Sequence, residues 1–472
     1  MSAQHTLTYV GARGLAAALN MASLAVFTRL APTETYGAYL LVLSWALVLY
    51  GATCQWPKFS FFALYDEARA GVQAGTVLRL LAVMIGLAAL AASVAAALGL
   101  VEPRAAAAIV AAVFGMTAFE GSAEIARTRL EVRAVALSIV LRAVLVLGLG
   151  SAALLATGDP VHLLLATALA NVLAALPACL AIAPLLRGAG SLAEAGRLLA
   201  YGWPLVLSFG TAALAQTIDR FVIGGGIGTR ELGAYGAVAD VLRQSFVVFG
   251  DGIALSLISL AKRDARAGGM AAARPVLEDA ARALTLVAGF GAVFFLAFDD
   301  LVVGVLLGPD YRETALSVIP ILVAASILLM VRSYYFGQVI YFAPSSRLDA
   351  VASAALLVTT GGLCALLIPR FGLVGAALAV AIGQGVACLV FVLGAGPRLR
   401  MPLPLADLGL IALAALACWA AVEGVDALGL GGGVAIPAKL GLIALAAGAT
   451  AWRFDVAGVA GLAARLGGRS AR

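Results

Sequence analysis

Apolar runs long enough to cross a lipid bilayer recur along the whole chain, separated by short polar breaks. A run of roughly 20 apolar residues spans the hydrocarbon core as an α-helix, because a helix satisfies all of its own backbone hydrogen bonds there. Of the 472 residues, 63% are hydrophobic and 12% are charged, and the mean hydropathy is +1.05. Soluble domains are about half apolar and about a quarter charged. The sequence therefore predicts an all-α, polytopic membrane protein.

Charged residues, prolines and glycines divide the chain into about 14 predicted transmembrane helices. The predicted spans are residues 9–30, 37–57, 77–100, 105–126, 136–157, 161–184, 202–226, 232–260, 282–307, 313–334, 349–369, 372–395, 404–422 and 434–452. The longest polar break, Lys262 to Ala281, is read as a cytoplasmic loop. Because no loop is long enough to hold an acceptor substrate, the sequence disfavours an enzyme and favours movement of a substrate across the bilayer.

The distribution of basic residues predicts that the N-terminus and the C-terminus are both cytoplasmic. With the N-terminus inside, most of the 31 Lys and Arg residues flank the inner ends of the spans and few flank the outer ends. Basic residues near the ends of spans are retained on the cytoplasmic side. The same bias accounts for the net charge of +6, and the basic stripe with interleaved aromatic residues that nucleic-acid binding requires is not found.

Sequence signals for a metal, a cofactor or a nucleotide are not found. The chain has two histidines, and its five cysteines lie singly in apolar spans without C-x-x-C spacing. No G-x-x-x-x-G-K-[ST] motif for binding nucleotide phosphates occurs. We therefore expect no metal site and no cofactor, and we expect the cysteines to pack as small apolar side chains.

A repeated pattern predicts two homologous halves. Glu34–Tyr39 (ETYGAY) is matched by Arg230–Tyr235 (RELGAY), and Asp66–Gly71 (DEARAG) is matched by Arg263–Gly268 (RDARAG). With six spans in each, the halves are parallel repeats, and such repeats usually enclose a site that opens alternately to each side. The alternative is chance similarity between helices rich in Gly and Ala. The predicted divisions are an N-terminal six-helix half at 1–190, a C-terminal six-helix half at 191–396, and two additional helices with a cytoplasmic tail at 397–472.

Two stretches resemble a known family. Residues 219–244, DRFVIGGGIGTRELGAYGAVADVLRQ, resemble the seventh-to-eighth-helix region of Wzx-type polysaccharide-unit flippases, and Phe27–Ser44, FTRLAPTETYGAYLLVLS, is similar to the opening of that family. These flippases belong to the multidrug, oligosaccharidyl-lipid and polysaccharide (MOP) exporter superfamily. The resemblance implies a MATE-like fold.

The same resemblance implies a function and a location. The expected activity is translocation of undecaprenyl-pyrophosphate-linked oligosaccharide repeat units across the bacterial inner membrane, for O-antigen, capsule or exopolysaccharide synthesis. The implied partners are membrane lipid and this lipid-linked glycan, with a polysaccharide polymerase and chain-length machinery as candidates. Two alternatives remain: a drug or cation exporter of the same superfamily, and a non-transporting scaffold in a polysaccharide assembly complex.

Arginines inside the predicted spans are the candidate substrate-binding residues. An arginine at the centre of a span costs roughly 2.5–3.5 kcal/mol on insertion scales, so such a residue faces a cavity or a partner. The guanidinium also donates paired hydrogen bonds to phosphate and stays charged. The four candidates are Arg243, Arg220, Arg13 and Arg332.

Each arginine has a simpler explanation that the sequence leaves open. Arg243 is about 16 Å into its span, near the midplane, but Asp240 on the same helix face could neutralise it. Arg220 lies toward the outer side, and its long side chain could reach the interface. Arg13 and Arg332 lie near inner ends of spans, where interfacial anchoring would also explain them.

Three acidic residues complete the set of candidates. Asp219 points about 100° away from Arg220 on a helix, so it could bind a coupling ion or a proton. Asp240 is a second candidate for a coupling ion, or for an ion pair with Arg243. Glu120, about two turns from the cytoplasmic end of its span, is expected to be interfacial.

Overall fold

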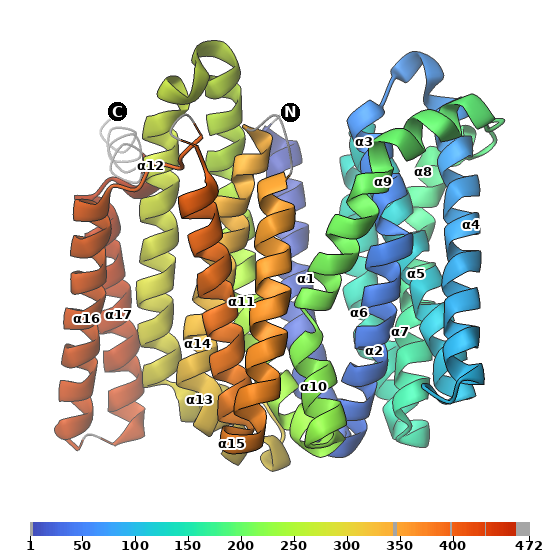
Figure 1. Ribbon diagram of the computed structural model, residues 1–472. Coiled ribbons are helices and arrows are strands. Elements are labelled where there is room, and N and C mark those ends of the chain that lie inside the picture. The colour runs from blue at the N-terminus through green and yellow to red at the C-terminus, as the bar shows by residue number, and fades with distance from the viewer. Residues whose placement is uncertain (1–2, 343–346, 397–398, 430, 459–472) are drawn as a thin grey trace. The chain divides into compact units, whose positions relative to one another are not determined.

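The computed structural model describes residues 3–342, 347–396, 399–429 and 431–458, and every regular element within these ranges is a helix (Figure 1). The predicted all-α, polytopic class is therefore confirmed. Ten of the described helices are long and apolar enough to cross a membrane, or eleven if the bent pair α7–α8 forms one span. The predicted count of 14 is not confirmed.

The helix bounds follow the predicted spans closely in most of the chain. The helices up to residue 226 are α1 (Ala3–Leu30), α2 (Thr33–Thr53), α3 (Gln55–Leu64), η1 (Glu67–Arg69), α4 (Ala70–Ala97), α5 (Pro103–Thr128), α6 (Val132–Thr157), α7 (Pro160–Ala174), α8 (Leu176–Leu186), α9 (Leu192–Ala215) and α10 (Ile218–Gly226). The remaining elements are α11 (Thr229–Ile253), the π-helical turn η2 (Ala254–Ile258), α12 (Ser259–Ala297), α13 (Asp299–Leu306), η3 (Pro309–Tyr311), α14 (Arg312–Tyr334), η4 (Phe336–Tyr341), α15 (Arg347–Gly394), α16 (Leu405–Ala427), α17 (Gly432–Arg453) and η5 (Val456–Gly458).

Local turn chemistry explains where several helices end. After α6, Gly158 adopts a φ of +62°, a left-handed conformation that glycine reaches without a steric penalty. The Asp159 carboxylate then accepts a hydrogen bond from the Val161 N–H at 2.7 Å, and Pro160 occupies the first turn of α7. These three signals place the boundaries at the residues that the sequence predicted.

Glycine also breaks two long helices. The 48 residues of α15 would extend about 72 Å as one straight helix, which exceeds one membrane crossing. This helix is interrupted at Gly372, whose φ is +55°, and this break separates the spans predicted at 349–369 and 372–395. In α12 the interruption falls at Gly268 and Gly269.

The segment from Lys262 to Ala281, predicted as a loop, is helical on both sides of the break in α12. Its charged residues lower the hydropathy, and low hydropathy indicates that a segment does not favour lipid. Low hydropathy does not exclude a helix, and this segment is rich in alanine, the strongest helix former. The loop prediction was therefore wrong.

The chain divides into two compact units. Unit 1 comprises Met1–Val238, Val305–Ala315 and Thr360–Ala376, and unit 2 comprises Ala239–Gly304, Leu316–Thr359 and Ala377–Arg472. In unit 1, α1 packs along α6, α5 packs along α7, and α9 packs against α2 and α3. The six-helix halves expected from the repeat remain a prediction.

The two copies of the repeated Gly-Ala-Tyr motif meet inside unit 1. Gly37 near the start of α2 faces Gly233 near the start of α11, and a methyl group on Gly37 would overlap the carbonyl oxygen of Thr229. Reciprocally, a methyl group on Gly233 would overlap the carbonyl oxygen of Thr33. The two helices therefore approach backbone to backbone at equivalent positions of the repeat.

In unit 2 the C-terminal helices α16 and α17 pack together and against α12, as Figure 1 shows. An apolar cluster fills the contact with Phe290, Val293, Phe298, Ala415, Cys418, Val422 and Ile443. Two ion pairs flank it, Arg282 with Asp407 at 2.8 Å and Lys439 with Asp426 at 2.5 Å. The last two predicted spans are thus part of the packed unit.

Candidate functional site

The buried charged side chains of the helices are mostly basic. Among the described residues, Lys58, Arg220, Arg332 and Lys439 are buried, each at most 9% exposed, and Glu194 is the one buried carboxylate. A charge removed from water inside a membrane protein is costly and is usually kept for a function or held by a partner. These side chains are therefore the starting point for the site.

One buried cation, Lys58, lies in a three-residue cluster of unit 1. Cys54 separates α2 from α3. The Nζ of Lys58 on α3 donates a hydrogen bond to the hydroxyl of Tyr50 on α2 at 2.7 Å. Lys58 also forms an ion pair with Glu120 of α5. The Tyr50 hydroxyl donates to the same Glu120 oxygen at 2.7 Å. Each of the three groups is therefore bonded to the other two.

This cluster shows how the two charges are held. Lys58 is 6% exposed, and the Glu120 side chain, 40% exposed, is held by groups from two other helices. The interfacial position expected for Glu120 stays a prediction. The sequence carries a signal for this arrangement, since Lys58 has Trp-Pro before it and Phe-Ser-Phe-Phe after it.

A second group of candidates lies where α10 meets α11 in unit 1. The helix breaks after α9, and α10 then places Asp219 and Arg220 in its first turn. Arg220 is 5% exposed, so its guanidinium is enclosed within the protein. The Asp219 carboxylate accepts a hydrogen bond from the hydroxyl of Tyr235 at 3.3 Å. Tyr235, the last residue of RELGAY, is itself buried.

In unit 2, Arg243 and Asp240 form the ion pair that the sequence left open as an alternative. They lie one turn apart on α11, and the guanidinium donates to the Asp240 carboxylate at 2.8 Å. The side chain of Arg243 is 39% exposed, so the pair leaves part of the guanidinium accessible. Contact with substrate stays a prediction for both residues.

Arg332 is buried inside unit 2. It is 9% exposed, and its Nε donates a hydrogen bond to the side-chain oxygen of Gln384 on α15 at 2.7 Å. Asp349 is close enough to interact with it electrostatically. The fourth candidate, Arg13, is half-buried in α1, and its role in binding also stays a prediction.

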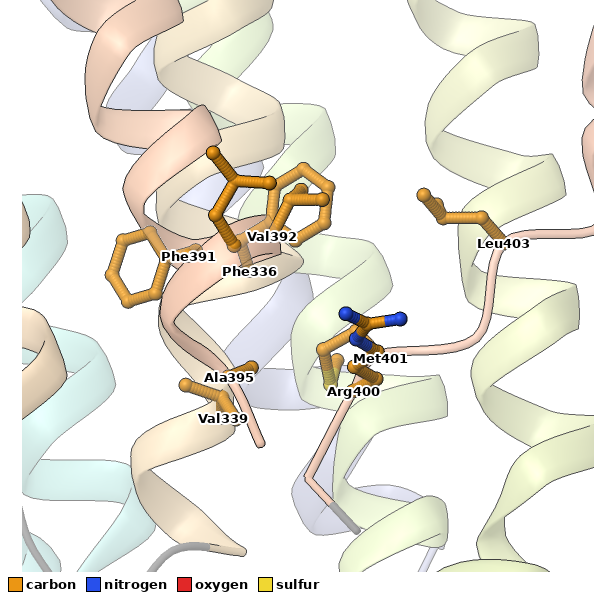
Figure 2. Close-up of a pocket in the computed structure, with 9 residues that line it drawn as sticks. Phe336, Val339, Phe391, Val392, Ala395, Arg400, Met401 and Leu403 are labelled. Carbon is orange, nitrogen blue, oxygen red and sulfur yellow. The ribbon is translucent and has the colours of Figure 1, made fainter. Parts of the chain in front are cut away.

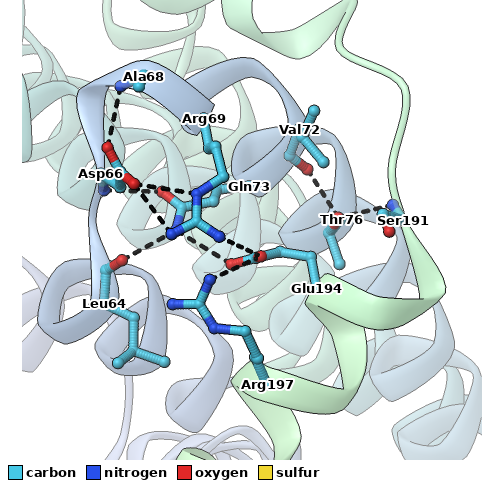
Figure 3. A network of polar contacts seen from close by, with 10 residues as sticks. All are labelled: Leu64, Asp66, Ala68, Arg69, Val72, Gln73, Thr76, Ser191, Glu194 and Arg197. Atoms are coloured by element: carbon cyan, nitrogen blue, oxygen red, sulfur yellow. Dashed lines mark hydrogen bonds and ion pairs between the residues drawn. The ribbon is translucent and has the colours of Figure 1, made fainter.

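A polar network joins the start of α4 to the start of α9 in unit 1 (Figure 3). Buried Glu194 accepts a hydrogen bond from Gln73 at 3.0 Å and from Arg197 at 3.2 Å, and Arg69 lies 3.8 Å away. Hydrogen bonds from Arg69 and from a backbone N–H hold the pKa of exposed Asp66 below its usual value. The DEARAG motif thus forms a turn that is fastened to the start of α9 within unit 1.

Comparison with known proteins shows the family of this chain. Residues 75–316 match the family model described as polysaccharide biosynthesis protein. The chain belongs to this family. Among curated protein sequences no significant match is found.

Solved structures show that this polysaccharide biosynthesis protein has the fold of MOP superfamily transporters. The lipid II flippase MurJ in an inward closed conformation is similar with a TM-score of 0.75 and 12% identity, over 96% of this chain and 99% of that chain. An inward-facing multidrug resistance MATE family transporter of the MOP superfamily is similar with a TM-score of 0.60 and 16% identity, over 81% and 93%. The predicted MATE-like fold is therefore confirmed, and the family match confirms that the chain belongs to a polysaccharide biosynthesis family.

Proposed function

We propose that the protein is a flippase that moves undecaprenyl-pyrophosphate-linked oligosaccharide repeat units across the bacterial inner membrane by alternating access. Both termini would be cytoplasmic, and the units would serve O-antigen, capsule or exopolysaccharide synthesis. The family match supports the polysaccharide pathway. The fold supports transport, since the similar solved proteins are a lipid II flippase and a multidrug transporter.

The excess of buried basic side chains is the observation that supports an anionic substrate. Four Lys or Arg residues are buried within the described ranges against one carboxylate, Glu194. A pyrophosphate head group needs cationic groups to replace its hydration, and guanidinium groups do this without losing their charge. An exporter of cationic drugs would need the opposite balance.

In this proposal the arginines bind the phosphates and the acidic residues respond to the coupling ion. Arg243, with its partly accessible guanidinium, would make the first contact, and Arg220, Arg13 and Arg332 would follow. Asp219 would exchange its hydrogen bond with Tyr235 for a proton or a cation. Asp240 would hold Arg243 in position until the substrate phosphate replaces it.

The test is leaflet exchange of a fluorescent undecaprenyl-pyrophosphate oligosaccharide in liposomes containing the purified protein. We expect exchange in the wild type and a loss of at least tenfold in Arg243→Ala, which corresponds to about 1.4 kcal/mol. The matched control is Arg274→Ala, which removes an exposed arginine that pairs with Glu278 on α12. Exchange of a cationic dye without exchange of the lipid would favour the drug exporter, and exchange of neither would favour the scaffold.

A further inference from the structure

A pocket in unit 2 has the chemistry of a site for one anionic phospholipid. It has a volume of about 330 Å³ and lies between η4, the C-terminal end of α15 and residues 399–404, called the connector here, which precede α16 (Figure 2). All three bounding segments belong to unit 2. None of the candidate residues for transport lines it.

The walls of this pocket are apolar. Phe336 of η4, Phe391 of α15 and Met401 of the connector are all buried. Two lining leucines are exposed, Leu393 at 75% and Leu403 at 37%. Exposed leucines on membrane-spanning helices contact hydrocarbon chains, so the pocket opens toward lipid.

Arg400 is the one charged residue among the described residues that line the pocket. Figure 2 shows it beside Met401 on the connector, across from Phe336 and Val392. Within the described part of the chain it makes no hydrogen bond or ion pair. Arg282, also in unit 2, by contrast has Asp407 as a partner at 2.8 Å.

The connector is held in place independently of Arg400. The hydroxyl of Tyr335, which is 1% exposed, donates a hydrogen bond to the carbonyl oxygen of Pro402. This bond attaches the connector at Pro402, two residues after Arg400, to Tyr335, which directly follows α14. The guanidinium is therefore presented at the pocket by a fastened backbone.

From these observations we propose that the pocket binds an anionic glycerophospholipid, with its phosphate on Arg400 and part of one acyl chain between Phe336 and Phe391. A single guanidinium matches the single charge of a phosphodiester, whereas a pyrophosphate carries more charge than one arginine balances. In the topology predicted from the sequence, this end of α15 faces the cytoplasmic leaflet. That leaflet is rich in anionic lipids, and basic pockets between helices bind their head groups there. The proposal requires membrane insertion but does not depend on the transport activity.

The proposal is tested with the full-length protein in neutral detergent, by following the thermal unfolding midpoint as phosphatidylglycerol is added. We expect phosphatidylglycerol to stabilise the wild type more than phosphatidylcholine with the same acyl chains. In Arg400→Gln the apparent Kd for phosphatidylglycerol should rise about fivefold. This rise corresponds to about 1 kcal/mol, the usual contribution of one basic residue near an anionic lipid surface. Because Arg400 is exposed, the variant should fold.

The control is Arg453→Gln, which removes an exposed arginine at the end of α17 outside the pocket. It should keep the wild-type response to phosphatidylglycerol. An unchanged Kd in Arg400→Gln, or equal stabilisation by phosphatidylcholine, would overturn the proposal. Displacement of phosphatidylglycerol by undecaprenyl pyrophosphate at lower concentration would also overturn it and would assign the pocket to the transported lipid.

Discussion

Gly37 and Gly233 occupy equivalent positions in the two copies of the repeated motif, and their backbones pack against each other. A methyl group on Gly37 would lie 2.7 Å from the amide nitrogen of Gly233, and one on Gly233 would lie 3.0 Å from the amide nitrogen of Gly37. The atoms on both sides belong to backbone, so no side chain can move aside to make room. The contact depends on the absence of side chains at both positions.

Gly37→Ala should therefore destabilise the protein by about 1–3 kcal/mol, the usual cost of inserting a methyl group into a packed contact. The thermal unfolding midpoint in detergent measures this loss. Gly86→Ala is the control, because a methyl group at that position of α4 meets open space. It should be neutral or slightly stabilising, since alanine favours a helix. Equal midpoints for the two variants would contradict the close approach.

Lys58→Met should destabilise unit 1 by leaving Glu120 and Tyr50 without their cation. We expect roughly 2 kcal/mol, less than for a fully buried pair, because the Glu120 side chain is 40% exposed. The double variant Lys58→Met/Glu120→Gln should recover part of the loss, because no unpaired charge remains. A double-mutant cycle on thermal unfolding measures the coupling. The exposed pair Glu124 and Arg127, treated in the same way, should show little coupling.

Asp240→Asn separates the two explanations of Arg243. If Arg243 binds the substrate phosphate, Arg243→Ala should abolish lipid exchange. Asp240→Asn should only slow exchange, because the arginine that Asp240 positions is still present. If the pair serves stability alone, both variants should lower the unfolding free energy by about 0.3–0.5 kcal/mol and leave exchange intact. The rate of lipid exchange is measured in liposomes, and the unfolding midpoint of the same purified variants is measured in detergent.

Acid should loosen the turn between α3 and α4. The pKa of Asp66 is lower in the folded protein than in the unfolded chain. The stabilisation by its carboxylate is therefore present above the pKa of the unfolded chain, near 4, and is lost as the pH falls through the pKa of the folded protein. Protection of the Ala68 amide, which bonds to Asp66, from hydrogen exchange, measured relative to the intrinsic rate at each pH, should therefore fall below about pH 4 in the wild type. Asp66→Asn should lack this transition, and an identical pH profile in both proteins would exclude the mechanism.

The sequence determined the class and most helix boundaries. Apolar runs of membrane-spanning length require helices, and signals such as Gly158, Pro160 and Gly372 act on the backbone of their own neighbourhood. The repeat and the resemblance to the Wzx-type flippases were also legible in the residues, and the family match supports the latter. Each of these features depends on residues close together in the chain.

Only the tertiary structure decided which distant side chains meet. Lys58 and Glu120 lie on separate helices, as do Arg332 and Gln384 and the glycines at 37 and 233. Hydropathy and spacing state which segments enter the membrane, but they do not state how far each helix is rotated or shifted along its neighbour. Packing of the whole bundle sets that rotation, because small residues, bends and side-chain volumes on several helices must fit at once.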